Sequence, residues 1–168
     1  MKTLQLNDIT CYLPYKLKVL NNNQINTVIK VCFKTNILRI VHKEGIVSTW
    51  DEVSLTLLKP ILKSMLDLNK PLENGNIPII ELAKIVFTSK NIKFSLYDNK
   101  VLVDYGDNLK YWFSTDSDFT YFHIEDCNLG VAMFPNQVKL FNYLNEYHFD
   151  YRGLIDKGLA IDINTIKE

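Results

Sequence analysis

The chain has 168 residues, of which 47% are hydrophobic and 23% are charged. This length and composition are typical of one globular domain with its own core, and they exclude a disordered chain. Nineteen Lys and Arg residues balance nineteen Asp and Glu residues, which argues against strong non-specific nucleic-acid binding as the main task.

Charge is distributed unevenly along the chain. Residues 1–70 carry ten basic and five acidic side chains, whereas residues 98–126 carry two basic and seven acidic ones. Local patches rather than net charge would therefore steer a partner. No apolar stretch reaches the roughly 18–20 residues that a membrane span needs, and "MKTLQLNDIT" lacks the apolar core of a secretory signal. We expect a soluble cytoplasmic protein without membrane contact.

The first third of the sequence alternates between apolar and polar residues, as strands do. Apolar residues follow Pro14 at every second position in "YLPYKLKVL", and "TVIKVCFK" places Ile29, Val31 and Phe33 on one face. Short polar turns lead into "ILRIVHK" and "IVSTW". The pattern predicts a short helix near 3–8 and then an antiparallel meander of three or four strands.

Two helices are predicted in the middle of the chain. Apolar residues recur at the spacing of one helical face over 54–68, with Pro60 inside the pattern. Pro78 can open a second helix, whose apolar stripe ends near Phe87. The loop "PLENGNIP" (71–78) marks the boundary if the chain divides, although we expect a single domain over 1–168.

A second meander and a helical end complete the expected fold. Polar turns separate "IKFSLY", "KVLVDY", "LKYWFS" and "FTYFHIE", which is the spacing of antiparallel hairpins. Pro135 opens a helix, and Asp150 and Gly158 bound a shorter one. We therefore predict an α+β fold with two antiparallel meanders, two central helices and a C-terminal helical pair.

Residues 145–164, "NEYHFDYRGLIDKGLAIDIN", contain His148, Asp150 and Arg152 at alternating positions. A histidine, a carboxylate and a guanidinium this close together are typical of an active or binding site. The same residues also suit helix ends, because Asp150 can cap the start of a helix and His148 the end of one. We interpret the stretch as a lid on the core and keep a site as the alternative.

Three stretches of the sequence carry a resemblance to other proteins. They are "YLPYKLKV" (12–19), "LKPILKSMLDLNK" with "IPIIELAKI" (58–70 and 77–85), and "HFDYRGLIDKGLAIDIN" (148–164). In these stretches the chain resembles a family of small uncharacterised proteins encoded by phages, prophages and mobile elements of Bacteroides-type bacteria. The resemblance implies a phage or mobile-element gene product that acts in the cytoplasm of a bacterial host cell. It implies no catalytic residue.

Motifs for cofactors and metals are missing from the sequence. The six glycines form neither a phosphate-binding loop nor a dinucleotide fingerprint. "HIEDC" (123–127) lacks the downstream P-C-x-x-C of a zinc deaminase, and "DSD" (116–118) lacks the glycine and glutamate of a calcium loop. Cys11, Cys32 and Cys127 form no C-x-x-C pair, so we expect each to be a small buried hydrophobe. We predict no cofactor, no metal site and no enzyme activity.

The acidic second meander is the leading candidate for a binding surface. Exposed aromatic rings among carboxylates suit contact with a basic protein surface. The candidate residues are Asp104, Asp107, Trp112, Asp116, Asp118 and Tyr121. A solvated acidic face with core-facing rings is the alternative interpretation.

The basic first meander is the rival surface. Several cations on successive strands can form a stripe that attracts phosphate. The residues concerned are Lys16, Lys18, Lys30, Lys34 and Arg39. The polar outer face of an antiparallel sheet is the alternative interpretation here.

These features favour a phage or mobile-element accessory protein that binds a host or phage protein with a basic surface. One version is an anti-CRISPR-like inhibitor of a bacterial nucleic-acid-dependent defence system. The alternative is a nucleic-acid-binding module that uses the basic strands, and a third hypothesis is an enzyme with an unrecognised cleft. The sequence specifies neither the partner nor an oligomeric state.

Overall fold

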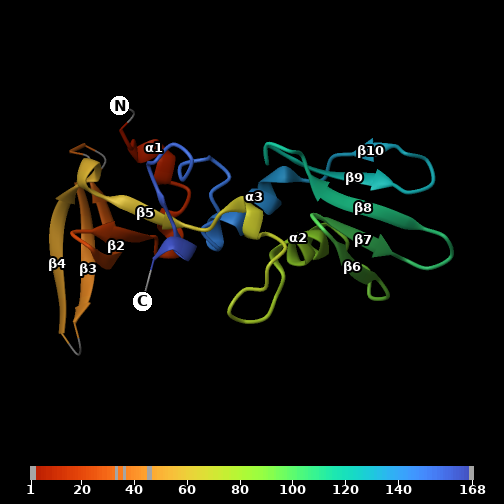
Figure 1. Ribbon diagram of the computed structural model, residues 1–168, viewed down its shortest axis with the longest axis horizontal. Coiled ribbons are helices and arrows are strands. Elements are labelled where there is room, and N and C mark those ends of the chain that lie inside the picture. The colour runs from red at the N-terminus through yellow and green to blue at the C-terminus, as the bar shows by residue number, and fades with distance from the viewer. Residues whose placement is uncertain (1–2, 33, 36, 45–46, 167–168) are drawn as a thin grey trace. The chain divides into compact units, whose positions relative to one another are not determined.

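Figure 1 presents the computed structural model of the chain. It describes residues 3–32, 34–35, 37–44 and 47–166, and within 42–51 it describes the backbone only. Both helices and antiparallel strands are present, so the predicted α+β class is confirmed.

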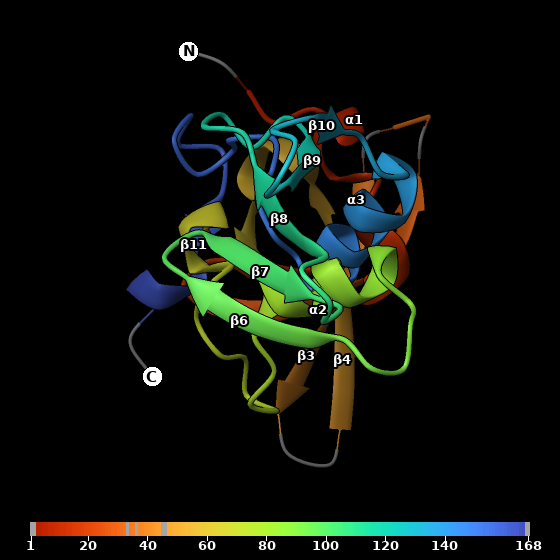
Figure 2. The same cartoon turned by 90° about the vertical axis from the view of Figure 1, so that its right-hand side faces the viewer.

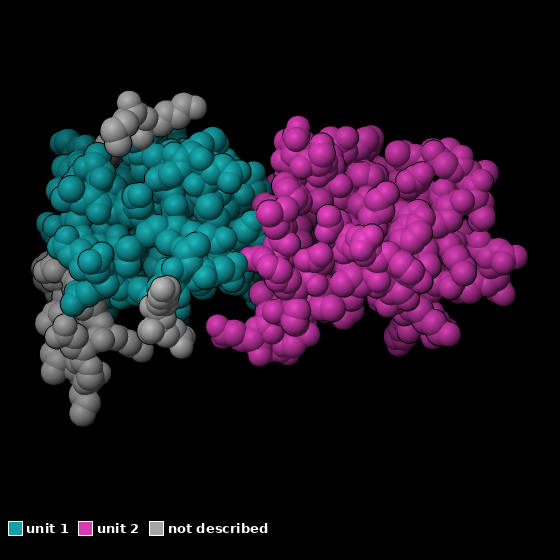
Figure 3. Space-filling view, viewed as in Figure 1, with its two compact units in different colours: residues 1–64, 144–168 teal, residues 65–143 magenta. Residues whose placement is uncertain are grey.

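The described chain forms two compact units. Residues 1–64 and 144–168 make up the first unit, and residues 65–143 make up the second (Figure 3). The loop 71–78 lies inside the second unit. The prediction of a single domain with a sub-boundary at that loop stays a prediction.

The sheet of the first unit has the strand order β11-β5-β1-β2-β3-β4. Its strands are β1 (Lys18–Asn21), β2 (Gln24–Cys32), β3 (Ile37–Glu44), β4 (Val47–Ser54), β5 (Lys59–Leu62) and β11 (Ile161–Asp162). Neighbouring strands pair antiparallel, except that β11 runs parallel to β5. Strands β1 to β4 follow one another as hairpins, in the region where the sequence alternates.

The core of the first unit includes residues from both ends of the chain. Helix α1 (Leu6–Ile9) buries Ile9, and Tyr12 behind it is fully buried. The Tyr12 hydroxyl donates a hydrogen bond to the Phe149 carbonyl oxygen at 2.9 Å. Burial raises the pKa of Tyr12 well above its usual range, so the hydroxyl keeps its proton. This bond joins the segment before β1 to the segment after the last helix.

The predicted helix over 54–68 is wrong. The segment instead forms a 3₁₀ turn at Leu55–Leu57, strand β5 and a second 3₁₀ turn at Met65–Asp67. Pro60 has no amide hydrogen to donate within a helix, and it holds the preceding residue in an extended conformation. Every residue of β5 after Lys59 is buried, so apolar spacing that suits a helix also suits a strand covered on both faces. The other predicted central helix is present as α2 (Pro78–Val86).

The sheet of the second unit is antiparallel throughout, in the order β10-β9-β8-β7-β6 (Figure 2). Its strands are β6 (Lys93–Tyr97), β7 (Lys100–Asp104), β8 (Lys110–Thr115), β9 (Phe122–Asp126) and β10 (Ala132–Met133). Strands β6 to β9 lie where the sequence predicts strands. Strand β10 is an addition that the sequence pattern did not indicate.

Side-chain alternation gives the second sheet a buried inner face. Its fully buried or nearly buried members are Val101, Val103, Phe113, Phe122 and Ile124. Helix α2 packs against β6 and β7, and Phe87 directly after α2 meets the Phe113 ring edge-on, with centroids 6.5 Å apart. The Phe113 and Phe122 rings stack at 5.6 Å. A shift of one residue in any of these strands would turn its buried side chains outward, so this packing determines the register.

Helix α3 (Gln137–Glu146) begins in the second unit and ends in the first. The Gln137 side chain fixes its start, because it accepts a hydrogen bond from the Phe122 amide and donates one to the Phe122 carbonyl, both at 2.8 Å. The Phe141 ring packs edge-on against Phe122 at 6.0 Å. A side-chain amide therefore replaces a strand partner at the start of β9.

The predicted short helix over 150–158 is wrong, because the chain there forms turns. Gly153 has a left-handed backbone with φ of +64°, which ends any helix at that point. The predicted capping role of Asp150 is present in another form. Its carboxylate accepts hydrogen bonds from the amides of Leu154 at 2.9 Å and Ile155 at 2.6 Å. These bonds close the segment over the core without a helix.

Replacing Tyr12 by Phe tests the bond that joins the two ends of the first unit. The change removes one of two donors to the Phe149 carbonyl, which also accepts from the Tyr151 amide. We expect Tyr12→Phe to lower the free energy of unfolding by about 1 kcal/mol. Urea denaturation followed by circular dichroism measures the loss. Tyr97→Phe is the control, because Tyr97 is exposed, and an equal loss in both variants would refute the assignment.

Candidate functional site

The four predicted aspartates do not form one cluster. Asp104 and Asp107 belong to the β7–β8 end of the second sheet, whereas Asp116 and Asp118 lie in the β8–β9 loop at the opposite end. The six residues of β8 separate the two pairs, which corresponds to about 20 Å at the rise of an extended strand. The predicted acidic surface is therefore two acidic loops.

Asp104 and Asp116 shape the loops that carry them. The Asp104 carboxylate accepts a hydrogen bond from the Gly106 amide at 2.8 Å and pairs with Lys110 at 3.3 Å. The hydrogen bond, and secondarily Lys110, lowers the pKa of Asp104. Burial acts to raise the pKa of Asp116, but hydrogen bonds from its own loop outweigh burial and leave that pKa lowered. Both carboxylates are therefore charged at neutral pH.

The two predicted aromatic residues lie in different surroundings. Trp112 is half-buried on the outer face of the sheet, where its ring meets Tyr97 edge-on at 5.5 Å. Tyr121 is 41% exposed in the β8–β9 loop. Its ring meets Phe134, which follows β10, at 5.5 Å. Tyr121 thus connects the predicted acidic loop to a part of the surface that sequence reasoning missed.

That missed surface is the segment 129–134, "LGVAMF", which we term the β10 edge. Leu129 is 75% exposed and Phe134 is 69% exposed, and Val131, Ala132 and Met133 are exposed as well. Exposed apolar residues are ordinary when scattered, but a contiguous group is informative. The signal in the sequence was the uninterrupted apolar run between Gly130 and Pro135.

Carboxylates lie beside the β10 edge. The Asn128 side chain donates to the Asn108 carbonyl at 2.9 Å, which ties the start of the edge to the loop that carries Asp107. Glu125 pairs directly with Ala132 across the strands. Residues 111–138 contain four acidic side chains and no Lys or Arg. The edge is therefore an apolar strip in a segment of the chain that carries acidic but no basic side chains.

The predicted basic residues of the first unit are only partly brought together. Lys18, Lys30 and Arg39 lie on the outer face of the sheet, and Lys30 is directly opposite Arg39. Arg39 also forms an ion pair with Glu52 at 2.9 Å, which offsets its charge. Lys16 and Lys34 are exposed but lie outside the strands.

The three cysteines are not all buried, so that expectation is wrong. Cys32 and Cys127 are exposed, and Cys11 is half-buried. Cys32 lies in a depression of about 310 Å³ on the outer face of the first sheet, lined also by Lys30 and Arg39. Hydrogen bonds from Thr35, and then the nearby amide of Lys34, lower the pKa of the Cys32 thiol. Burial and the neighbouring Asp126 and Glu125 raise the pKa of the Cys127 thiol.

A serine and a histidine meet in the second sheet, a pairing that sequence reasoning also missed. Ser114 and His123 are cross-strand neighbours, and their Oγ and Nε2 atoms are 3.0 Å apart. Ser114 is buried, and Nδ1 of His123 has no hydrogen-bond partner among the described residues. A nucleophilic serine needs a base that a third group orients. The described residues place no third group on Nδ1 of His123.

The stretch 145–164 closes over the core of the first unit. Arg152 donates to the Asn7 carbonyl at 2.7 Å, whereas the Asp150 carboxylate binds the backbone amides of its own turn. His148 has a left-handed backbone, and its carbonyl accepts from the Lys63 amide at 2.8 Å. The side chains of Arg152 and Asp150 thus bind different backbone groups, and the His148 ring has a hydrogen bond with the Tyr15 backbone.

The pKa of His148 nevertheless differs from that of an ordinary histidine. Burial, together with the charges of Lys63 and Lys18, lowers its pKa to about 4, against an opposing hydrogen bond with the Tyr15 backbone. Nε2 of His148 is buried without a hydrogen-bond partner among the described residues. The imidazole is therefore neutral at physiological pH.

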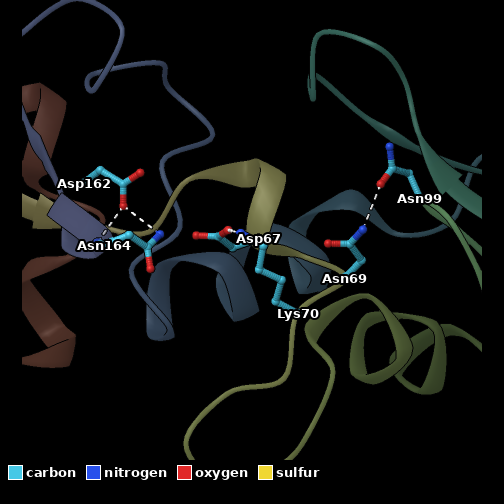
Figure 4. Close-up of polar contacts among 6 residues, drawn as sticks. All are labelled: Asp67, Asn69, Lys70, Asn99, Asp162 and Asn164. Carbon is cyan, nitrogen blue, oxygen red and sulfur yellow. Dashed lines mark hydrogen bonds and ion pairs between the residues drawn. The ribbon is translucent and has the colours of Figure 1, made fainter.

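A crevice in the second unit is too small for a substrate. Its lining includes Asn69 and Asn99, and its volume is about 20 Å³, roughly the space of one water molecule. Figure 4 shows the Asn69 side chain directed at Asn99, to which it donates at 3.2 Å, and the ion pair of Asp67 with Lys70 at 2.6 Å. Within the described ranges no group of three or more His, Cys, Asp or Glu side chains is placed to hold a metal ion.

Comparisons with known proteins indicate no family for this chain. No family model, no curated protein and no solved structure matches the chain. No helix in the described part of the chain has the length and apolar character needed to cross a membrane.

His148 predicts a pH dependence of stability. An unfolded histidine titrates near 6.5 and the folded one near 4, so the unfolded state binds more protons between these values. Burial of the neutral His148 ring therefore makes a pH-dependent contribution of no more than about 3 kcal/mol to the free energy of unfolding. This contribution is complete above pH 6.5 and is lost as the pH falls towards 4. His148→Asn, which suits the left-handed backbone, should flatten this part of the stability curve in urea titrations. His123→Asn is the control, and an unchanged slope in His148→Asn would contradict the assignment.

We expect the two exposed cysteines to be alkylated at different rates. At pH 7.5 we expect iodoacetamide to modify Cys32 faster than Cys127, because the thiolate is the reactive form and the pKa shifts of the two thiols have opposite directions. Peptide mass spectrometry over a time course measures both rates in one sample. A Cys32→Ser variant should leave the Cys127 rate unchanged. Faster modification of Cys127 would overturn the expectation.

Proposed function

We propose that this chain is a non-enzymatic protein-binding module that contacts its partner through the β10 edge and the acidic loops beside it. The observation that carries the proposal is the joint exposure of Leu129, Met133 and Phe134 in a segment without positive charge. Contiguous apolar surface with a polar rim is typical of interaction sites.

The carboxylates indicate the chemistry of the partner. Asp104 and Asp116 have lowered pKa values and remain charged at neutral pH. Asp107 and Asp118 add negative charge to the same two loops, and Glu125 lies directly opposite Ala132 of the β10 edge. A partner with Lys or Arg side chains around an apolar anchor complements this arrangement, and opposite charge also speeds association.

The biological setting of the proposal comes from the resemblance of the three sequence stretches. It supports a phage or mobile-element protein whose partner is a host or phage protein in the bacterial cytoplasm. In the more specific version the chain is an anti-CRISPR-like inhibitor of a nucleic-acid-dependent defence system. A negatively charged protein surface can occupy a basic groove that otherwise holds nucleic acid.

Nucleic-acid binding by the first sheet is the second candidate function. The observation in its favour is that Lys18, Lys30 and Arg39 share one outer face. The ion pair of Arg39 with Glu52 weakens this candidate function, because it offsets the positive charge of Arg39. Gel shifts at several salt concentrations distinguish the two functions, since binding through phosphates falls steeply with salt.

A double variant of the β10 edge tests the leading function. Met133→Ser with Phe134→Ser removes two exposed apolar side chains, so we expect a change of less than about 0.5 kcal/mol in folding stability. We expect capture of a protein partner from a Bacteroides-type lysate to fall by about tenfold or more, as for anchor residues of an interface. Quantitative mass spectrometry of the captured proteins gives the measurement.

Leu57→Ser is the matched control, because Leu57 is 70% exposed but belongs to the first unit. It should capture the same partner in the same amount as the unmodified chain. An absence of any specific partner, or equal losses in the control and the double variant, would refute the proposed function.

A further inference from the structure

The backbone of the β10 edge has hydrogen-bonding groups that point away from the sheet. The Val131 carbonyl accepts from the Asp126 amide at 3.1 Å, so it faces β9. Backbone groups of successive residues in a strand point to opposite sides, which directs the N–H and C=O of Ala132 away from β9. β10 is the last strand in the order of this sheet. These groups are therefore available to another strand.

The side chains of the β10 edge resemble those of an interior strand. A run of apolar residues, rather than an alternating pattern, is typical of strands that are covered on both faces. Val131, Ala132, Met133 and Phe134 form such a run, yet all four are exposed. The segment thus has the apolar composition of a strand that is covered on both faces, although it lies at the edge of the sheet.

The opposite edge of the same sheet shows how an edge is normally protected. Strand β6 exposes Lys93, Ser95 and Tyr97. Lysine and other polar side chains on an edge oppose pairing with further strands. The β10 edge has no charged or polar side chain between Leu129 and Phe134, so it lacks this protection.

Charge identifies the occupant that this edge would accept. Residues 111–138 contain four acidic side chains and no basic one. Pairing with the β10 edge of a second copy would bring two such segments together, and like charges across strands are destabilising. An extended segment with Lys or Arg side chains brings opposite charge instead.

We propose that the β10 edge binds an extended, basic segment of another protein by adding it as a further strand to the second sheet. The main-chain hydrogen bonds of Ala132 supply pairing, the exposed apolar side chains supply contact, and the flanking carboxylates select for positive charge. This inference rests on the proposed function and specifies how that surface engages its partner.

The test uses the full chain and a blocked eight-residue peptide that alternates Lys with Val. Amide chemical shifts in two-dimensional NMR should change at 129–134 on titration, and the affinity should fall with added salt. A peptide that alternates Glu with Val should not bind. A Lys–Val peptide with every backbone amide N-methylated, which has no backbone N–H to donate, should lose binding as well.

A variant of the chain tests the same hydrogen bonds from the other side. Ala132→Pro removes an amide hydrogen that faces away from β9, a position that an edge strand tolerates. We expect it to weaken peptide binding by about tenfold. Ala132→Ser keeps the amide and should stay within about twofold of the unmodified chain. The N-methylated peptide keeps the test decisive if Ala132→Pro does not fold.

The inference is overturned by shift changes that leave 129–134 unaffected, by no binding of the Lys–Val peptide, or by equal binding of the Glu–Val or N-methylated peptide. Self-association of the chain through the same amides, detected by sedimentation, would also overturn it. These results are separable from the proposed function. If Met133→Ser with Phe134→Ser loses the captured partner but Ala132→Pro does not, the surface binds a protein without strand addition.

Discussion

The alternation of side chains across the second sheet is the constraint on which the candidate surface depends. Burial of Val101, Phe113 and Ile124 on one face determines which residues of β7, β8 and β9 point outward. Phe87, directly after α2, contacts the Phe113 ring, Phe141 of α3 contacts the Phe122 ring, and the Gln137 side chain binds the start of β9. The register of β10 then follows from its pairing with β9, and its apolar side chains stay exposed.

The acidic side chains of this sheet have a structural and an electrostatic role at once. Asp104 and Asp116 hold their loops by accepting backbone hydrogen bonds, and those bonds also keep them charged. The same groups therefore form the loops and carry negative charge, which Lys110 offsets at Asp104. Because one acidic loop lies at each end of the sheet, a partner that meets both must extend along the edge rather than contact a single spot.

Sequence patterns predicted the strands better than the segments between them. Alternation located β6 to β9, because a half-buried strand has a period of two residues. It also located β2 but not its faces, because a register shift between Val28 and Lys30 leaves Ile29 53% exposed. Phe33, predicted on the same face, lies outside the described residues. The helix expected around Pro60 failed, since short apolar runs suit a buried strand as well as a helix. The short helix after Asp150 failed because a single left-handed glycine, Gly153, redirects the chain.

The candidate site was only partly predictable. Local sequence placed Trp112 and Tyr121 near carboxylates, but successive hairpin turns alternate between the ends of a sheet, so Asp104 and Asp116 were separated. The sequence pattern did not indicate the β10 edge, because a strand of two residues is too short for a periodic signal. Whether an apolar run is covered depends on what packs on it, and the local pattern of residues does not show those tertiary contacts.

The central claim is that the β10 edge meets a protein with a basic segment, and site-specific photo-crosslinking tests it most directly. Benzoylphenylalanine replaces Phe134 in one sample and Tyr97, exposed on the opposite edge strand, in another. The account predicts an adduct at position 134 with a segment of another protein rich in Lys and Arg, and none at position 97. No adduct at 134, equal adducts at both positions, or an adduct with nucleic acid or with a second copy of the chain would contradict it.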